Sequence, residues 1–341
     1  MPPHDDKRNG FSSRMMNRQP LRACPSVSVI IPVFNRAQLV ERAIRSVLEQ
    51  SHRRFEIIVV DDGSTEDIVG ALYEMRSRRL RLVSHDKNCG AATARNTGIS
   101  KARGQYVAFL DSDDEWLPQK LKRQLAFMLS FDDPARLSCT ASKVVLGDRS
   151  EGETRFAKSR ITEMDMAFGC RISPGSTLMA EKSLFSQVGP MNEKMARLED
   201  WDWLLRALRT SELFVLNEAL SVIHQRNGRE TCYHAVKTST HIMRPKHFRA
   251  PGLFALMARL KFLAALENEL AAAAYRGGRY GLALWHFMAS LCYMPYRNLD
   301  TIRRIGSTII RDIFQLGCRS ERGRQQSALS VPSGLSPVAT P

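Results

Sequence analysis

The feature that most limits the possible fold is an alternation of strand and helix patterns in the first third of the chain. Apolar runs rich in β-branched residues occupy residues 26–33 and 55–60, and strand-like runs follow at 79–84 and 105–110. Helical patterns separate successive runs. Continuous apolar runs are typical of strands that are buried on both faces. We therefore expect an α/β fold with a mostly parallel, doubly wound sheet flanked by helices.

Polar residues follow three of these four strands directly where each strand ends. Ligands of doubly wound sheets bind beyond the carboxyl ends of the strands, so a site is expected in these loops. Asp111 and Asp113 flank Ser112 on a tight turn after the fourth strand. Two carboxylates placed in this way suit a hard divalent cation, Mn²⁺ or Mg²⁺, that neutralises a diphosphate leaving group. An ordinary solvated turn is the alternative interpretation.

A second acidic pair, Asp61 and Asp62, ends the neighbouring strand at 55–60. Its carboxylates are expected to point into the same crevice and to accept hydrogen bonds from a nucleobase and a ribose. A simple turn capped by Ser64 or Thr65 is the alternative, and both interpretations can hold together.

A helix start after the third strand carries Gly90, Arg95 and Asn96. Gly90 lets the backbone approach a ligand closely, and Arg95 brings positive charge toward a diphosphate. The alternative is that the small residues here only allow the helix to pack tightly on the sheet.

Two further candidates lie later in the chain. Asp200 follows Glu199 at the start of a helix, where a carboxylate can serve as the general base that deprotonates an acceptor hydroxyl. Acidic residues in a first helical turn are also favoured by the helix dipole alone. His224 follows an apolar segment and is a candidate third metal ligand or diphosphate contact, with a purely structural histidine as the alternative.

The remainder of the chain predicts a mixed region followed by helices. Shorter strands are expected at 138–145, 176–180 and 213–223. Leucines spaced as on an amphipathic helix follow from residue 256 to 270, a second helix follows Gly278, and a third is expected near 302–316. The expected organisation is a disordered leader, an α/β domain, a helical C-terminal extension and a disordered tail, at residues 1–25, 26–230, 231–319 and 320–341.

The formal net charge of +15 lies mainly after the α/β region, where Glu230 is the only acidic residue from Arg226 to Lys261. A solvated basic face and peripheral contact of basic C-terminal helices with an anionic membrane are both open. No nucleic-acid motif accompanies the charge, so nucleic acid is not expected as a partner.

The cysteines and the hydropathy pattern indicate the compartment. Seven cysteines are scattered without C-x-x-C or zinc spacing, which indicates a reducing environment. Residues 1–25 lack the apolar core of a signal peptide, and the charge-free apolar run at 281–296 is shorter than the ~20 residues that a spanning helix needs. We expect a cytoplasmic protein, at the inner face of the cytoplasmic membrane where membrane contact occurs.

The chain resembles the family 2 glycosyltransferases of the GT-A fold in six segments that follow one another in the same order. These segments are VSVIIPVFNR, IIVVDDGSTED, NCGAATARNTGI, GQYVAFLDSDDEWLPQKL, GSTLMAEKSLFSQVGPMNE and LEDWDWLLRAL. The resemblance covers roughly residues 25–229. It implies an inverting transfer of a sugar from a nucleoside diphosphate sugar to an acceptor hydroxyl, assisted by a divalent metal.

The resemblance also implies roles for individual residues. The nucleoside pocket would be lined by Pro32, Phe34, Asn35, Asp61 and Asp62. Asp111 and Asp113 would form the metal and ribose motif, Arg95 and Asn96 would lie near the donor, and Asp200 matches the catalytic base. Ser221, Val222 and Ile223 precede His224 where the family often has an aromatic–Arg–x–His segment, so the ligand role of His224 is less well supported.

The resemblance favours a UDP-sugar as donor and a saccharide or lipid-linked acceptor in polysaccharide or glycolipid biosynthesis. A nucleotidyltransferase of similar fold would have a Gly-rich loop after the first strand, and residues 33–36 contain no glycine. A dinucleotide-binding motif and a P-loop are also absent from the sequence. A non-catalytic nucleotide-sugar binding or scaffold protein remains an alternative, although every expected acidic residue is present.

Overall fold

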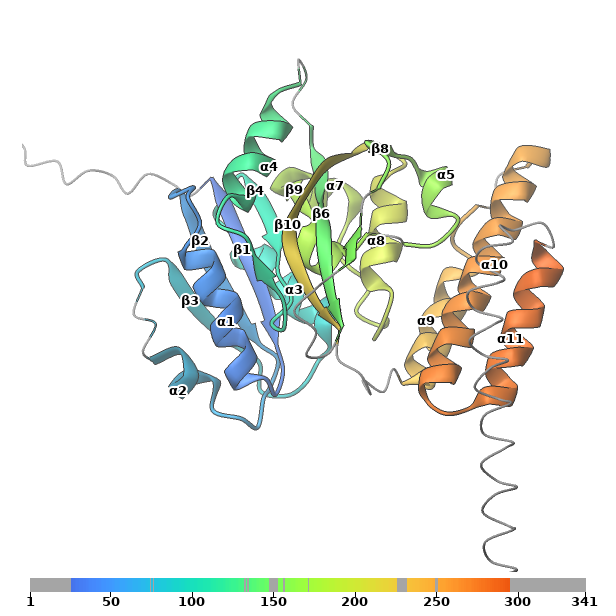
Figure 1. Cartoon of the computed structure of the whole chain (residues 1–341), viewed down its shortest axis with the longest axis horizontal. Coiled ribbons are helices and arrows are strands. Elements are labelled where there is room, and N and C mark those ends of the chain that lie inside the picture. Colours follow the sequence, from blue (N-terminus) through green and yellow to red (C-terminus); the bar gives the residue numbers. More distant parts are fainter. Residues whose placement is uncertain are drawn as a thin grey trace, which may run out of the picture.

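The computed structural model describes residues 26–294, apart from residues 74, 76, 132, 134, 147–152, 156, 171, 226–231 and 249–250 (Figure 1). The expected leader at 1–25, the helix near 302–316 and the tail at 320–341 lie outside the described residues.

The N-terminal half of the sheet is parallel, as the sequence predicts. β1 (Val27–Val33) pairs with β2 (Phe55–Asp61) on one side and with β4 (Tyr106–Phe109) on the other. β3 (Leu80–Ser84) pairs with the free side of β2. All four strand predictions are confirmed to within one or two residues at their ends.

Helices cover both faces of this half of the sheet. They are α1 (Ala37–Leu48), α2 (Ile68–Tyr73) and α3 (Ala91–Lys101). Alternate side chains of β1 therefore enter two separate cores, in which Val29 packs with Ile44 of α1 and Ile30 packs with Ala94 of α3. The approach of α3 is close, since a Cβ on Gly98 would lie 2.4 Å from Ile30 Cγ2.

The other half of the sheet is mixed. The strand order is β3-β2-β1-β4-β9-β6-β10-β5, with β9 (Met179–Glu181) antiparallel to both of its neighbours. β6 (Leu137–Leu146) runs parallel to β10 (Leu213–Gln225), and β5 (Glu115–Trp116) is antiparallel to β10. Two short strands, β7 (Glu153–Arg155) and β8 (Arg160–Ile161), pair with β6 and β10.

The predicted strand at 176–180 is partly wrong. The chain forms a short helix, α6 (Pro174–Thr177), and becomes β9 only from Met179 onward. Pro174 at the first helical position favours this turn, because its ring fixes φ near the helical value. The Thr177 hydroxyl also donates to the Ser173 carbonyl at 2.9 Å. This short helix brings Ser176 to the end of β4, where it enters the candidate site.

The remaining helices pack around the second half of the sheet and beyond it. They are α4 (Lys120–Leu129), α5 (Glu163–Met166), α7 (Lys182–Val188), α8 (Glu199–Ala207), α9 (Tyr233–Met243), α10 (Leu253–Arg276) and α11 (Tyr280–Tyr293). The last three lie side by side next to α8 in Figure 1, and they confirm the helices expected at 256–270 and after Gly278.

The C-terminal helices share a core with the α/β region. Phe262 of α10 is fully buried, and its ring lies 5.6 Å from that of Trp201 in α8 in an edge-to-face arrangement. His247 Nε2 lies 2.9 Å from Asp202 Oδ1, and both side chains are buried. Among the described helices, none combines the length and the apolar character that a membrane span requires.

Candidate active site

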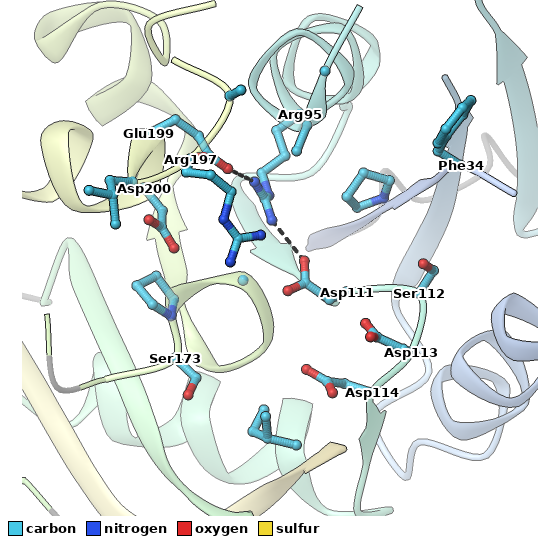
Figure 2. A pocket seen from close by; sticks show the side chains of 18 of the residues that line it. Phe34, Arg95, Asp111, Ser112, Asp113, Asp114, Ser173, Arg197, Glu199 and Asp200 are labelled. Carbon is cyan, nitrogen blue, oxygen red and sulfur yellow. Dashed lines mark hydrogen bonds and ion pairs between the residues drawn. The ribbon is translucent and has the colours of Figure 1, made fainter. Parts of the chain in front are cut away.

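A cleft of about 1000 Å³ opens at the carboxyl ends of β1, β2 and β4 (Figure 2). It extends to the loop before α8 and to the end of α10. Most residues singled out from the sequence lie in its wall: Pro32, Phe34, Asp62, Gly90, Arg95, Asp111, Asp113, Asp200 and His224. Asn35, Asp61 and Asn96 are not among the residues that line this cleft.

Three carboxylates meet on the turn that follows β4. Oxygen atoms of Asp111, Asp113 and Asp114 all lie within 4.8 Å of one another. The turn is closed by the backbone N–H of Asp114, which donates to the Asp111 carbonyl at 3.0 Å. The acidic turn defined by these three residues is therefore compact enough for its carboxylates to address one cation.

Ser176 of α6 fixes the acidic turn through two hydrogen bonds. Its hydroxyl donates to Asp114 Oδ2 at 2.5 Å and accepts the backbone N–H of Asp111 at 3.1 Å. The backbone N–H of His224 donates to the other oxygen of Asp114 at 2.9 Å. The sequence does not predict the role of Asp114, because its position depends on partners that come 62 and 110 residues later.

The acidic turn carries an excess of negative charge. Burial raises the pKa of Asp114 to about 8, and the carboxylates of Asp111 and Asp113 contribute in the same direction. An all-oxygen set of carboxylates is the donor set that Mg²⁺ and Mn²⁺ prefer. The residues present therefore fit a hard divalent cation, which would relieve the repulsion between these three carboxylates.

Two arginines partly balance this charge. Arg36, at the start of α1, forms an ion pair with Asp113 at 3.2 Å. Arg95 of α3 donates to Asp111 Oδ1 at 2.7 Å and to Glu199 Oε1 at 2.6 Å, as Figure 2 shows. Burial alone would lower the pKa of Arg95, but the two carboxylates raise it above its usual value. Arg95 is therefore a permanent cation between the acidic turn and α8.

The start of α8 presents Asp200 to the cleft. The preceding residue, Leu198, has a left-handed backbone with φ of 63°, a conformation that costs energy for a residue with a branched side chain. This turn directs Glu199 toward Arg95 and leaves Asp200 in the cleft wall. Burial and then the charge of Glu199 raise the pKa of Asp200 to about 6. Asp200 is thus a carboxylate that titrates near neutrality.

On the opposite part of the cleft, Pro32 lies near the end of β1 and Phe34 directly follows this strand, with its side chain exposed. Asp62 points toward the start of α3, where its carboxylate accepts the backbone N–H groups of Cys89 at 3.0 Å and Gly90 at 2.7 Å. Gly90 has φ of 94°, which a residue with a side chain rarely adopts. Asp62 therefore orders the loop that forms this side of the cleft.

Asn35 and Asp61 have local structural partners. The Asn35 side chain accepts the backbone N–H of Thr65 at 2.8 Å, and Asp61 Oδ1 accepts that of Ser64 at 3.0 Å. The residues thus form a turn, as in the alternative considered from the sequence, but the side chains that accept these backbone N–H groups belong to Asn35 and Asp61 and not to Ser64 or Thr65. Both residues shape the loop after β2 that lies next to the cleft.

The remaining two predicted residues have different surroundings. Asn96 faces away from the cleft, since its amide donates to the Met191 carbonyl and to Glu193, both at 2.9 Å. His224 lines the cleft, and its Nε2 lies 2.7 Å from Glu115 Oε1. The metal-ligand role of His224 remains a prediction.

Arg36, Arg197 and Glu199 also belong to the site, although the sequence patterns do not single them out as site residues. Arg36 could have been predicted from the sequence, because it lies in the loop after the first strand, two residues after Phe34. Glu199 adjoins Asp200 in the acidic helix start. For Arg197 the sequence offers no comparable signal, because its position depends on the backbone turn at Leu198.

Comparison with known proteins finds similarity to glycosyltransferases. Residues 28–168 match the model of the family described as Glycosyl transferase family 2. A glycosyltransferase named for teichuronic acid biosynthesis, TuaG of Bacillus subtilis, is 48% identical over 107 residues, which are 31% of this chain and 42% of TuaG. The glucosyltransferase WfgD of Escherichia coli is 39% identical over 103 residues, covering 30% of this chain and 41% of WfgD. The matches to these two relatives thus span less than half of their length.

Solved structures show the same fold at low sequence identity. TarS of S. aureus, residues 1–349 in complex with UDP-GlcNAc, aligns with a TM-score of 0.53 and 20% identity over 82% of this chain and 92% of that structure. The mannosyltransferase PcManGT of Pyrobaculum calidifontis, in complex with GDP-Man and Mn²⁺, aligns with a TM-score of 0.51 and 19% identity over 83% of this chain and 85% of that structure. The fold is that of the GT-A glycosyltransferases, and residues 28–168 are similar to glycosyltransferase family 2.

Proposed function

We propose that this protein transfers a sugar, with inversion at the anomeric carbon, from a nucleoside diphosphate sugar to an acceptor hydroxyl. The observation that carries the proposal is that one cleft holds both the acidic turn and Asp200. The reaction needs negative charge neutralised at the leaving diphosphate and a base at the attacking hydroxyl. The two groups of the cleft supply these two requirements.

The donor would occupy the part of the cleft between β1 and the start of α3. Phe34 offers an apolar surface for a nucleobase, and Asp62 and Gly90 line the same side. UDP is the favoured nucleotide. TarS was solved in complex with UDP-GlcNAc, and the name of WfgD specifies UDP-Glc as donor. PcManGT was solved with GDP-Man, so the nucleotide is a point for experiment.

The acidic turn would hold the metal, Mn²⁺ or Mg²⁺, through Asp111, Asp113 and Asp114, with His224 as a further candidate ligand. When bound, such an ion supplies Lewis-acid neutralisation of the leaving diphosphate. The protein's own contribution is to hold the carboxylates in place. Ser176 and the backbone of His224 orient Asp114, while Arg95 and Arg36 orient Asp111 and Asp113.

Asp200 would act as the general base. A carboxylate with a pKa of about 6 is mostly ionised at neutral pH, yet it is a better proton acceptor than an ordinary aspartate. A single displacement follows, in which the acceptor oxygen attacks the anomeric carbon, its proton passes to Asp200 and the nucleoside diphosphate leaves. This sequence of bond changes inverts the configuration of the sugar.

The acceptor is proposed to be a saccharide or a lipid-linked saccharide in polysaccharide or glycolipid biosynthesis. Support comes from the names of TuaG, which specifies teichuronic acid biosynthesis, and WfgD, which specifies a diphosphoundecaprenol-linked acceptor. With such an acceptor the protein would work in the cytoplasm, at the inner face of the membrane.

Peripheral membrane contact through the C-terminal helices forms part of this proposal. Leu253 and Phe254 of α10 and Trp285 of α11 are exposed to 75%, 76% and 70%. Exposed apolar side chains on basic helices can insert into an anionic lipid surface. Flotation with phosphatidylglycerol liposomes tests this contact, and a protein that stays at the bottom of the gradient would contradict it.

The replacement Asp200→Asn tests the catalytic assignment. The variant is expected to bind UDP and Mn²⁺ as the wild type does and to lose turnover by roughly 10²–10⁴-fold, the usual contribution of a general base. Asp86→Asn is a matched control, because Asp86 is exposed and does not line the cleft. Full activity in Asp200→Asn would show that another group takes the proton.

A further inference from the structure

One part of the cleft wall has no role in the steps described above. It is built by Arg197 from the loop before α8 and by four residues from the end of α10 and the start of α11, and is called here the acceptor wall: Arg197, Glu269, Tyr275, Arg276 and Tyr280. In Figure 2 the Arg197 guanidinium points into the cleft between Asp200 and Asp111.

The acceptor wall carries two arginines that differ from the other arginines of the cleft. Arg36 and Arg95 form ion pairs with the acidic turn. Within the described part of the chain, neither Arg197 nor Arg276 is in a salt bridge, and Arg276 Nε donates only to the Ala272 carbonyl of its own helix. Their remaining donors are available to a ligand.

Arg197 and Arg276 are close enough for their charges to influence each other and Glu269. Burial lowers the pKa of Arg276 against the effect of Glu269, and the positive charge of Arg197 lowers it further. Both arginines also act on Glu269, whose pKa is raised by its burial. The acceptor wall itself thus carries two guanidinium groups and one carboxylate, an excess of positive charge that can attract an anion.

The acceptor wall is continuous with the proposed base. Cys170, Asp200 and Glu269 line the same cleft, and Arg197 of the acceptor wall is three residues before Asp200. The carboxylates of Asp200 and Glu269 also both raise the pKa of the buried Cys170 thiol. A ligand held by the acceptor wall would therefore lie next to Asp200, which is where the attacking hydroxyl must be.

Two tyrosines complete the acceptor wall. The rings of Tyr275 and Tyr280 lie 5.6 Å apart at an interplanar angle of 72°. The turn between α10 and α11 fixes this arrangement, because Gly278 has φ of 69° and the backbone N–H of Arg279 donates to the Ala274 carbonyl at 2.9 Å. Tyrosine presents an apolar ring and a polar hydroxyl together, which suits a sugar with its apolar C–H face and its hydroxyl rim.

We infer that the acceptor wall binds an acceptor saccharide that carries a negatively charged group, either a carboxylate or a phosphate ester, close to the attacking hydroxyl. The arginines would bind the anion, for which a guanidinium offers paired donors in one plane. The tyrosines would contact the sugar. The inference rests on the proposed glycosyl transfer and adds to it the chemical class of the acceptor.

The test is a calorimetric titration of the full chain, loaded with UDP and Mn²⁺, with three probes. They are a disaccharide ending in glucuronic acid, decyl-diphosphate-linked N-acetylglucosamine, and decyl N-acetylglucosaminide as the neutral reference. At least one charged probe is expected to bind about tenfold or more tightly than the neutral one, the size of one charge-assisted contact. Which charged probe binds more tightly distinguishes a carboxylate from a phosphate.

Two variants assign the preference to the acceptor wall. Arg276→Gln and Arg197→Gln are expected to remove most of the preference for the charged probe while UDP affinity stays within about twofold. Arg279→Gln is the matched control, because Arg279 lies three residues further along and contacts Tyr233 outside the cleft. Thermal melting of each variant reports whether it is folded.

Two results would overturn the inference: equal binding of the charged and neutral probes, or weaker UDP binding in Arg276→Gln with unchanged probe binding. The second result would assign the arginine to the donor. Failure of the proposed function itself appears separately, as a wild-type protein that does not bind UDP with Mn²⁺. The inference would then fall with it.

Discussion

Arg95 Nη1 donates a hydrogen bond of 2.6 Å to Glu199 Oε1, although 104 residues separate the two in the sequence. The other terminal nitrogen of Arg95 donates to Asp111, so one buried cation joins α3, the acidic turn and α8. This contact sets the separation between the proposed metal site and the proposed base.

Replacement of Arg95 by methionine leaves Glu199 buried without its partner. We expect the free energy of unfolding to fall by about 3–5 kcal/mol, as when one member of a buried ion pair is removed. Denaturant unfolding followed by circular dichroism measures the change. Arg123→Met is the control, because the Arg123–Glu218 pair is exposed and its loss should leave stability nearly unchanged. Equal effects of the two replacements would contradict the role given to Arg95.

Gly175 supports the acidic turn by having no side chain. A Cβ at this position would lie 2.5 Å from Asp111 Oδ2, which is closer than real contacts allow. Gly175→Ala should therefore displace the Asp111 carboxylate and weaken Mn²⁺ binding by about tenfold, the effect of one misplaced ligand. The melting temperature should change little, because a side-chain carboxylate can move.

Gly281→Ala is the matched control for this replacement, since no atom lies within 4 Å of a Cβ at Gly281. Titration of both variants with Mn²⁺, followed by electron paramagnetic resonance, measures the affinity. Unchanged affinity in Gly175→Ala would show that Asp111 is not a metal ligand.

The pH dependence of turnover should report Asp200. A general base must be ionised, and burial together with Glu199 raises the pKa of Asp200 to about 6. Activity should therefore be high above pH 6 and fall below it, with log(kcat/KM) losing about one unit per pH unit on the acid side. A pH profile at saturating Mn²⁺ measures this limb. An acid limb near pH 4, the range of an ordinary aspartate, would contradict the assignment.

The C-terminal helices should unfold together with the α/β region. Phe262 of α10 is fully buried against Trp201 of α8, so Phe262→Ala should cost about 3–5 kcal/mol of stability. Leu253→Ala in the same helix is the control, and its effect should stay within about 0.5 kcal/mol because Leu253 is exposed. Two separate unfolding transitions in the wild type would show that residues 231–294 form an independent unit.

The strands can be predicted from the sequence because each one is marked by the apolar pattern of its own residues. Residues 27–33 and 55–61 are mostly apolar, since helices cover both faces of the sheet. The carboxyl ends of neighbouring parallel strands lie at one edge, and so the sequence also predicts that Asp62 and Asp111 line one cleft. The short helix at 174–177 could not be recognised in the same way, because its four residues are too few for a periodic pattern.

The parts of the site that the sequence does not predict depend on distant contacts. Asp114 is held by Ser176 and by the backbone of His224, and neither contact can be read from the turn itself. Asn96 shows the reverse case. The sequence predicts it near the donor, but on the helix it faces the loop at Met191, to which its amide both donates and accepts. Arg95 and Asn96 are adjacent on α3, and neighbouring side chains of a helix point in different directions, so only Arg95 faces the cleft.

Metal-dependent donor binding at the acidic turn is tested by calorimetric titration of the wild type and of Asp111→Asn with UDP and GDP, first with Mn²⁺ and then with EDTA. The wild type should bind UDP more tightly than GDP and only when metal is present. Asp111→Asn should lose at least about tenfold in affinity. Equal binding with Mn²⁺ and with EDTA, or no binding in either, would contradict a metal-dependent donor site at the acidic turn.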